Sequence, residues 1–309
     1  MKNFEYLIKK NTWAVILLAI IFSFIFPHFG LFINPYLNYL LCLLMFLSCL
    51  DLNIKSIITS LSDFKGIILT LIIVHLISPF IIYLLRNFFS PEIYLGLIIV
   101  TTIPAGRSAV FLSNIYGGIP LKALVATSIS NIISPLSVPF IVWFFTHTII
   151  KMDPVAMGKN IAWMVILPLI IGYLFGKTPY GKKLDQHSTP VSTIVLFLII
   201  LGIISPIKNI IIQNPLLTLG LFIIISVLII INFILGFSFK KTYPERITYA
   251  LSCSYKNYTL ATLLSLSFFT PIVALPAIVY TITNNLLLIP LQSLMLSLNN
   301  EHSNHRRQL

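Results

Sequence analysis

Ten apolar runs, each long enough to cross the hydrocarbon core of a bilayer, take up most of this chain. They are continuous, which excludes the alternating strands of an outer-membrane barrel. Only 9% of the 309 residues carry a charge, against about 25% in soluble domains, so a water-soluble fold has no surface to offer. We expect an all-α polytopic membrane protein with ten transmembrane helices. The runs cover approximately residues 12–32, 34–51, 65–85, 91–116, 119–145, 156–176, 190–206, 215–238, 246–268 and 272–297.

The net charge of +12 does not indicate a nucleic-acid partner, because the basic residues are spread through the gaps between apolar runs rather than along one stripe. Cytoplasmic loops of membrane proteins are enriched in lysine and arginine. With the N-terminus in the cytoplasm, fourteen basic residues lie on the cytoplasmic side and four on the other: Arg86, Lys151, Lys159 and Lys208. The sequence therefore predicts a protein of the cytoplasmic membrane with both termini in the cytoplasm.

Residues that usually hold metals, cofactors or nucleotides form no motif in this sequence. The three cysteines, Cys42, Cys49 and Cys253, lie in apolar runs without a Cys-X-X-Cys pair. We therefore expect neither a disulfide framework nor a zinc site. The sequence also has no G-x-x-x-x-G-K-[ST] loop for a nucleotide phosphate. We expect no metal, no cofactor and no ATP-driven step carried by this chain.

An internal repeat divides the chain into two halves. The segment WAVILLAII at residues 13–21 recurs as WMVILPLII at residues 163–171, an offset of 150 residues. Residues 1–150 and 151–309 then hold five spans each. Because five is odd, the second half enters the membrane upside-down relative to the first. This inverted-repeat arrangement is typical of secondary transporters.

Two basic residues lie deep within spans, Arg107 in the fourth and Lys256 in the ninth. The offset of the repeat carries Arg107 to Asn257, and both positions lie in sequence that is unfavourable to helix, PAGRS at 104–108 and SCSYKN at 252–257. Broken helices at matching positions of two halves indicate the binding site of a transporter. All 8 acidic residues fall in loops, tails or span ends. The two cations therefore have no internal counter-ion, which predicts an anionic substrate.

The first break also predicts how an anion would be held. A half-helix that begins near Arg107 points its free N–H groups, with about half a positive charge, at the midplane. Arginine binds a carboxylate through two parallel hydrogen bonds. We expect Gly106, Arg107 and Ser108 to bind a small carboxylate, with Asn257 as a partner from the second break. The alternative is that the two cations are structural and rest on backbone carbonyls at the breaks.

The stretches from Pro104 to Pro135 and from Ser252 to Ala261 resemble the bile acid:sodium symporter family. Members typically have Pro-Gly-Gly-Thr-Ala-Ser-Asn in the fourth helix and Glu-X-Gly-X-Gln-Asn in the ninth, and the similarity extends over nearly the whole chain. It implies a transporter rather than an enzyme, with ten helices in two inverted five-helix repeats. Helices 1, 2, 6 and 7 would form a panel and helices 3–5 and 8–10 a core. Helices 4 and 9 would be unwound where they cross.

Most residues that bind sodium in that family are replaced here. The sodium-ligating Ser-Asn pair of the fourth helix becomes Ala109-Val110, and Ser252 and Lys256 stand where the ninth helix has its Glu and Gln. Thr127 matches a ligand threonine of the fifth helix. A site for a hard cation needs several oxygen ligands, and here the carboxylate is gone. We therefore expect transport that does not depend on sodium.

In place of the bound cation we expect the ammonium of Lys256, which would reach backbone carbonyls and the hydroxyls of Thr127 and Ser252. Because a buried amine can lose its proton, Lys256 is also a candidate proton relay, and His75 is a second one. Transport would then be coupled to protons, or it would be facilitative. For His75 the alternative is a role in helix packing. Asn131 is expected either to bond between helices or to line the cavity.

Other functions remain open from the sequence. One is a sodium-coupled organic-anion symporter, as in the parent family. Ser252 and Lys256 are four residues apart and could form the nucleophile and base of a membrane-embedded enzyme. A related family of arsenite exporters has a Cys in the fourth helix and a Glu in the ninth, where this chain has residues 105–107 and Ser252. The last is a non-transporting scaffold. The expected partners are a small organic anion, the lipid bilayer and protons; the sequence sets no oligomeric state.

Overall fold

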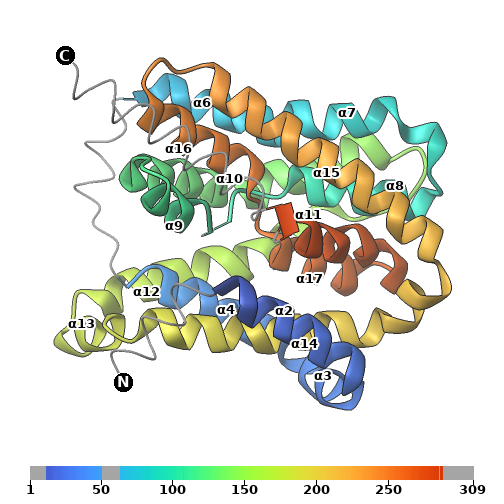
Figure 1. The fold of residues 1–309 in the computed structure, drawn as a ribbon, viewed down its shortest axis with the longest axis horizontal. Helices are drawn as coiled ribbons and strands as arrows, with labels where there is room; N and C mark the ends of the chain where they lie inside the picture. The colour runs from blue at the N-terminus through green and yellow to red at the C-terminus, as the bar shows by residue number, and fades with distance from the viewer. Residues whose placement is uncertain (1–11, 51–62, 107, 285, 288–309) are drawn as a thin grey trace.

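The computed structural model describes residues 12–50, 63–106, 108–284 and 286–287 (Figure 1). In this part of the chain the backbone is helical apart from turns, bends and one isolated antiparallel bridge, between Ala105 and Lys256. Residues up to 150 form α2 (Thr12–Ile25), α3 (Pro27–Ile33), η1 (Asn34–Tyr36), α4 (Leu37–Ser48), α6 (Phe64–Ile72), η3 (Ile73–Ile77), α7 (Ser78–Leu84), η4 (Arg86–Phe88), α8 (Pro91–Thr102), α9 (Ser108–Ile115) and α10 (Pro120–Thr146). Later residues form α11 (Pro154–Ile161), η5 (Ala162–Ile166), α12 (Leu167–Gly176), α13 (Pro179–Asp185), α14 (Ser188–Gln213), α15 (Pro215–Ser238), α16 (Tyr243–Ser254), α17 (Tyr258–Phe268) and η6 (Pro271–Ala274).

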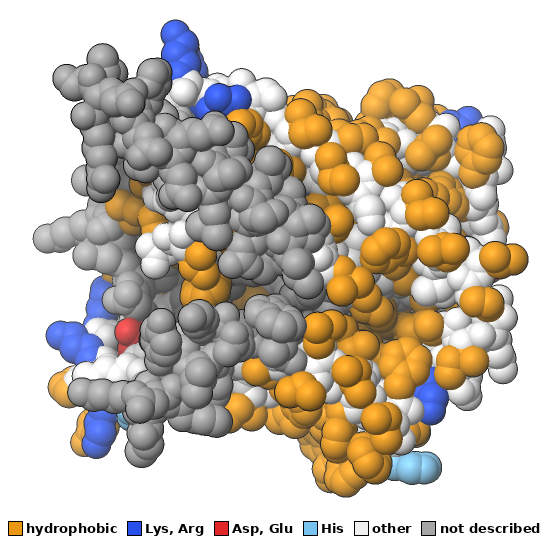
Figure 2. Space-filling model, in the orientation of Figure 1, with side chains coloured by type: hydrophobic (Ala, Val, Ile, Leu, Met, Phe, Trp, Pro, Cys, Tyr) orange, Lys and Arg blue, Asp and Glu red, His pale blue; other side chains and the backbone are white. Residues whose placement is uncertain are grey.

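The described helices are those of a membrane protein. Large apolar side chains point outward, for example Phe32, Leu136 and Leu216, which are 73%, 80% and 84% exposed. Figure 2 shows hydrophobic side chains over most of the face that is not grey. Such a surface would associate in water and is solvated by lipid. The expected all-helical polytopic membrane protein is confirmed. Among the described residues, six segments are long and apolar enough to span a bilayer: Pro27–Leu47, Phe64–Leu84, Pro120–Thr146, Pro154–Gly176, Pro190–Gln213 and Pro215–Ser238.

Two boundaries of the expected spans differ from those in the structure, and both lie near prolines. The expected spans 12–32 and 34–51 divide at Phe26, because α2 ends just before it and Pro27 begins the next helical run. Phe26 has φ −121° and ψ 62°, a non-helical conformation, and the residue before a proline is disfavoured in the α region. The expected span 190–206 is too short, since Pro206 lies inside α14. Within a membrane, neighbouring helices can compensate for the hydrogen bond that a proline removes.

The helices pack in two groups, one below the other in Figure 1. In the lower group α14 packs against α2, α3 and α4, and α4 packs against α12. In the upper group α15 packs against α16, α7 packs against α8, and α10 contacts α6, α8, α9 and α16. Helix α17 contacts α8 in the upper group and α4 and α14 in the lower. Helix α11 packs on α10 of the upper group and continues into η5, which contacts α4 of the lower group. These two helices therefore lie where the groups meet.

Basic side chains are distributed unevenly between the two ends of the helices. In Figure 2 more Lys and Arg side chains lie at the left edge, where Figure 1 has α13 and the start of α6, than at the right edge. This asymmetry has the sign that the positive-inside rule requires if the left end faces the cytoplasm. The described basic residues at that end include Lys122, Lys177, Lys182, Lys183, Lys240, Lys241 and Arg246.

The contact between α15 and α16 depends on a glycine. A Cβ at Gly236 would lie 2.5 Å from Tyr249 O and 2.7 Å from Ala250 Cα, whereas a Cβ at Gly220 of the same helix would meet nothing within 4 Å. We expect Gly236→Ala to lower the free energy of unfolding by about 1–3 kcal/mol, because the two backbones must separate. Gly220→Ala is the matched control and should be neutral or stabilising by up to about 1 kcal/mol. Equilibrium unfolding in detergent measures both, and equal effects would contradict the packing described.

Candidate binding site at two interrupted helices

Two helices are interrupted, and the interruptions lie against each other. The first interruption follows the end of α8 at Thr102 and includes residues 103–106, and residues 255–257 separate α16 from α17. The two extended segments run antiparallel. They are joined by backbone hydrogen bonds of 2.8 Å from Gly106 N to Tyr255 O and from Asn257 N to Pro104 O. Both interruptions lie where the sequence is unfavourable to helix, at residues 104–106 and 255–257, and the two contact each other.

The two breaks have different local causes. Ile103 is extended, with φ −57° and ψ 141°, as is favoured before a proline, and Pro104 has no N–H with which to continue α8. The second break contains no proline. There Asn257 caps α17, because its Oδ1 accepts a hydrogen bond of 3.2 Å from Leu260 N. Proline ends the first helix, whereas pairing with the first break and an asparagine cap hold the second break open.

Gly106 is required where the two segments touch. A Cβ at this position would lie 2.8 Å from Lys256 O and 3.1 Å from the carbonyl carbon. Real Cβ atoms do not approach backbone so closely, so any other residue would push the two breaks apart. The expected role of Gly106 at the site thus has a structural component, the close approach of the two backbones.

Lys256 is buried at the crossing, where its ammonium is bonded to backbone carbonyls. Its side chain is 1% exposed, and Nζ donates hydrogen bonds to Val74 O at 3.2 Å and to Thr101 O. The ion pairs that Lys122 and Lys240 make with Asp63 and Glu245 belong to a separate cluster. A buried cation is costly unless dipoles or charges stabilise it. Here the stabilising groups are backbone carbonyls, one of them in the last turn of α8, the negative end of that helix dipole.

The four half-helices divide the crossing into regions of opposite polarity. α8 and α16 end there, and their terminal carbonyls already have donors: Lys256 bonds Thr101 O, and Tyr280 Oη bonds Ser254 O. α9 and α17 begin there and present N–H groups. Helix N-termini are electropositive and favour anions. The arrangement can therefore stabilise a negative charge next to Gly106 and Asn257.

Not all of the expected site residues meet at Lys256. Arg107 lies outside the described residues, and its neighbour Ser108, half-buried, is the first residue of α9. Ser252 and Thr127 donate their hydroxyl protons to carbonyls of their own helices, Thr248 O at 2.9 Å and Leu124 O at 3.0 Å. The hydrogen bonds of the ammonium go to the carbonyls of η3 and α8 instead. A role for Thr127 and Ser252 as ligands stays a prediction.

Two polar residues connect α10 to this region. His75, 7% exposed, lies on the π-helical turn η3, and its Nε2 is 3.1 Å from Ser130 Oγ of α10. Asn131 Nδ2 donates to Thr127 O at 2.8 Å and to Ala105 O at 3.4 Å, in the first break. Asn131 therefore connects α10 to the first break, and a cavity-lining role for it stays a prediction.

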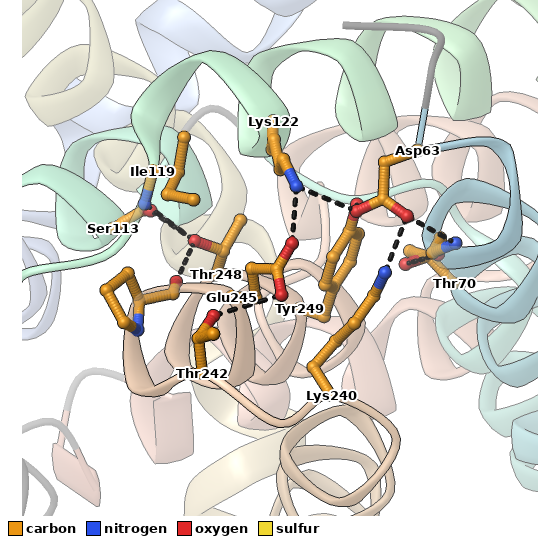
Figure 3. Close-up of polar contacts among 12 residues, drawn as sticks. Asp63, Thr70, Ser113, Ile119, Lys122, Lys240, Thr242, Glu245, Thr248 and Tyr249 are labelled. Atoms are coloured by element: carbon orange, nitrogen blue, oxygen red, sulfur yellow. Dashed lines mark hydrogen bonds and ion pairs between the residues drawn. The ribbon is translucent and has the colours of Figure 1, made fainter.

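A second polar cluster, which the sequence analysis missed, joins the ends of helices (Figure 3). Asp63 accepts hydrogen bonds from Lys240 Nζ at 2.5 Å, Lys122 Nζ at 3.0 Å and Tyr249 Oη at 2.7 Å. Lys122 Nζ also pairs with Glu245 at 2.5 Å. The cluster therefore links the starts of α6, α10 and α16 to the segment after α15. The acids are at span ends, as the sequence indicates, but their partners are too far along the chain for any local spacing to reveal them.

The carboxylate of Asp63 is charged at neutral pH. Burial by itself would raise the pKa of Asp63, but the hydrogen bonds from Lys240, Tyr249 and Lys122 outweigh it and hold the pKa below its ordinary value. Asp63 also caps α6, because Oδ1 accepts a hydrogen bond of 3.3 Å from Gly66 N. One carboxylate thus serves as both a helix cap and the centre of the ion-pair cluster.

Comparison with known proteins adds a family match. Residues 38–215 match the family model described as the Sodium Bile acid symporter family. The chain is similar to the "Uncharacterized sodium-dependent transporter YocS" of Bacillus subtilis (strain 168), with 25% identity over 288 residues that cover 89% of this chain and 87% of the relative. It is also similar to the "Uncharacterized protein YbaS" of the same organism, with 22% identity over 267 residues, 81% of this chain and 87% of that protein.

The cluster around Asp63 can be tested against a second capping aspartate. Asp153 caps α11 by accepting from Val155 N at 2.8 Å and Ala156 N at 3.1 Å, and asparagine caps helices as well as aspartate does. We expect Asp63→Asn to lower the free energy of unfolding by about 1–3 kcal/mol, because Lys122 and Lys240 lose their partly buried partner. Asp153→Asn should cost less than about 0.5 kcal/mol.

Comparing the wild type with Asp63→Asn at several pH values tests the lowered pKa of Asp63. A carboxylate with a lowered pKa stabilises the fold above its unfolded pKa, about 3.9 for aspartate, and loses that effect only as the pH falls through the folded value. The difference in unfolding temperature between the wild type and Asp63→Asn should therefore persist from pH 7 to pH 5. A difference that vanishes within this interval would contradict the pairing of Asp63.

Proposed function

The chain belongs to the Sodium Bile acid symporter family, and from this premise we propose that it is a secondary transporter that moves a small organic anion, a carboxylate, by alternating access. The coupling we propose is independent of sodium. The observation that carries the proposal is the position of Lys256, whose buried ammonium is held by two backbone carbonyls at the crossing of two broken helices.

We place this function in a fold of ten transmembrane helices built as two inverted repeats, residues 1–150 and 151–309. The two breaks support this division, because the bridge pairs Ala105 with Lys256, almost the offset at which the sequence repeats. Helices 1, 2, 6 and 7 would form a panel and helices 3–5 and 8–10 a core. The separate packing of α2, α3, α4, α12 and α14 supports the panel. In this proposal α11 and α17 lie at the interface that moves.

The substrate carboxylate would bind at the N-termini of α9 and α17. Gly106 and Ser108 flank the start of α9, and Asn257 caps α17. The Oδ1 atom of Asn257 is engaged by Leu260 N, so the amide NH₂ group is the end suited to a carboxylate. Arg107 lies between Gly106 and Ser108 in the chain, and we propose that it grips the carboxylate with two hydrogen bonds.

Lys256 would take the place of a bound sodium ion. Sodium is held by oxygen atoms, and the oxygens of Val74 and Thr101 are already bonded to the ammonium. A second monovalent cation beside Lys256 would be repelled by it. We therefore propose that the charge which the parent family supplies with sodium is built into this chain.

Coupling to protons, or facilitative exchange, follows if sodium is not used. The buried imidazole of His75 lies on the same π-helical turn as Val74, the partner of Lys256. Its contact with Ser130 gives it a neighbour on α10 with which it can exchange a hydrogen bond. We propose Lys256 and His75 as the groups that would carry a proton across the site.

The orientation we propose puts both termini in the cytoplasm of a cell whose cytoplasmic membrane holds the protein. The greater number of Lys and Arg side chains at the end where α13 lies supports this orientation (Figure 2). The partners would be the bilayer, the organic anion and, with proton coupling, protons. A nucleic-acid partner is not part of the proposal.

The second candidate is a sodium-coupled symporter of organic anions. It is favoured by the printed description of the relative YocS as a sodium-dependent transporter. A membrane-embedded enzyme with Ser252 and Lys256 as nucleophile and base is disfavoured, because Ser252 Oγ donates to Thr248 O and Lys256 donates to carbonyls. The two transport candidates differ in one measurable property, the dependence on sodium.

Uptake into proteoliposomes separates these candidates. Radiolabelled small mono- and dicarboxylates are offered in NaCl or in choline chloride at equal ionic strength. We expect initial rates that agree within about twofold between the two salts, and Lys256→Met should reduce them at least about tenfold, because the built-in charge is lost. Lys208→Met is the control, since Lys208 Nζ also bonds a carbonyl, Phe24 O at 2.7 Å, away from the crossing. Uptake that requires sodium would support the second candidate.

Arg107 can be tested by affinity. Arg107→Gln should weaken binding of the transported carboxylate by at least about tenfold, because a charge-assisted bidentate contact is lost. Arg86→Gln is the control, because Arg86 lies over the ring of Tyr83, 4.4 Å from its centroid, at a helix end. Unchanged affinity in Arg107→Gln would mean that the arginine does not contact the substrate.

A further inference from the structure

The carbonyl of Val74 can accept a hydrogen bond from Lys256 because its own helix is irregular at this point. Between α6 and α7 the chain forms the π-helical turn η3, and Ser78 N donates to Ile73 O, five residues back. The next residue, Pro79, has no N–H. In an α-helix the ring of Pro79 would also collide with the carbonyl of His75, four residues back, and the π register relieves this collision.

This arrangement leaves Val74 O without a backbone donor. In the α register its donor would be Ser78 N, which is used by Ile73 O. In the π register the donor would be the N–H of residue 79, which proline lacks. A carbonyl in the membrane interior must be satisfied by another group. Lys256 Nζ, 3.2 Å away, is that group.

Thr101 O, the second acceptor, is also orphaned by a proline. It lies in the last turn of α8, where carbonyls have no intrahelical donor. The residue that would bond it in a continuing α-helix is Ala105, which is displaced into the bridge after Pro104. Two proline-induced defects on neighbouring helices thus face one ammonium.

We propose that Pro79 is a positioning residue for Lys256: by leaving Val74 O without a backbone donor, it creates the acceptor that holds the ammonium beside the crossing. What this position does for transport rests on the proposed function, whereas the placement itself does not. In a Pro79→Ala variant, Val74 O would gain a backbone donor in either register: the N–H restored at position 79 in the π register, or Ser78 N–H in the α register. The hydrogen bond from Lys256 Nζ to Val74 O would then be replaced by a backbone hydrogen bond.

The chain contains the same motif without a lysine, which provides a control. The π-helical turn η5 ends with Leu167 N bonded to Ala162 O, and Pro168 follows. By the same reasoning Trp163 O is the orphaned carbonyl there. Among the described residues no lysine donates to it. Replacing Pro168 therefore changes a proline after a π turn but leaves the surroundings of Lys256 untouched.

The test is a double-mutant cycle read by thermal unfolding in detergent without substrate. The change in Tm caused by Lys256→Met is measured in three backgrounds: wild type, Pro79→Ala and Pro168→Ala.

We expect the change in Tm caused by Lys256→Met to be more negative, or less positive, by about 2–4 °C in the wild-type and Pro168→Ala backgrounds than in Pro79→Ala, the size of one hydrogen bond. Equal changes in all three backgrounds would overturn the proposal. Because no substrate is present, failure of the transport proposal would leave this result unchanged.

Discussion

The need to satisfy backbone groups inside a membrane governs the centre of this molecule. Breaking a helix there exposes N–H and C=O groups that no water can reach. Here two breaks meet, and each supplies part of what the other lacks through the bonds from Gly106 N to Tyr255 O and from Asn257 N to Pro104 O. The close approach depends on Gly106. The interruption in one half of the chain is therefore stable only because of the interruption in the other, which makes the crossing a joint property of two segments about 150 residues apart.

The groups left over after this pairing explain the polarity of the site. The helices that end at the crossing leave carbonyls, and the donors that satisfy them are Lys256 for Thr101 O and Tyr280 for Ser254 O. The helices that begin there leave N–H groups, which favour an anion. A fixed ammonium on the carbonyl side and a helix N-terminus on the other give a region that is electropositive without a free metal ion. This is the physical basis for proposing a carboxylate substrate and for proposing that sodium is dispensable.

Sequence patterns predict the membrane fold and both breaks. The length of an apolar run is a local feature that indicates a membrane span. The paired cations Arg107 and Lys256 are informative because a charge inside a membrane is energetically costly and is kept for a reason. Sequence patterns fail where partners are set by tertiary packing. The pattern places Ser252 beside the ammonium, but its hydroxyl donates to its own helix, since a hydroxyl in an apolar setting usually bonds the carbonyl four residues back. The cluster around Asp63 brings together positions 63, 122, 240, 245 and 249. Pro206 marks the expected end of a span, although α14 continues through it.

The central claim, that the ammonium of Lys256 replaces a bound sodium ion, is tested most directly by ligand-induced thermal stabilisation of the purified wild-type protein. Small carboxylates are screened in NaCl and in choline chloride at equal ionic strength, and the size of each shift follows from RT ln(1 + [L]/Kd). The account predicts that a carboxylate which stabilises the protein does so equally in the two salts. A carboxylate that stabilises it only in NaCl would contradict the account and would show that sodium still completes the site.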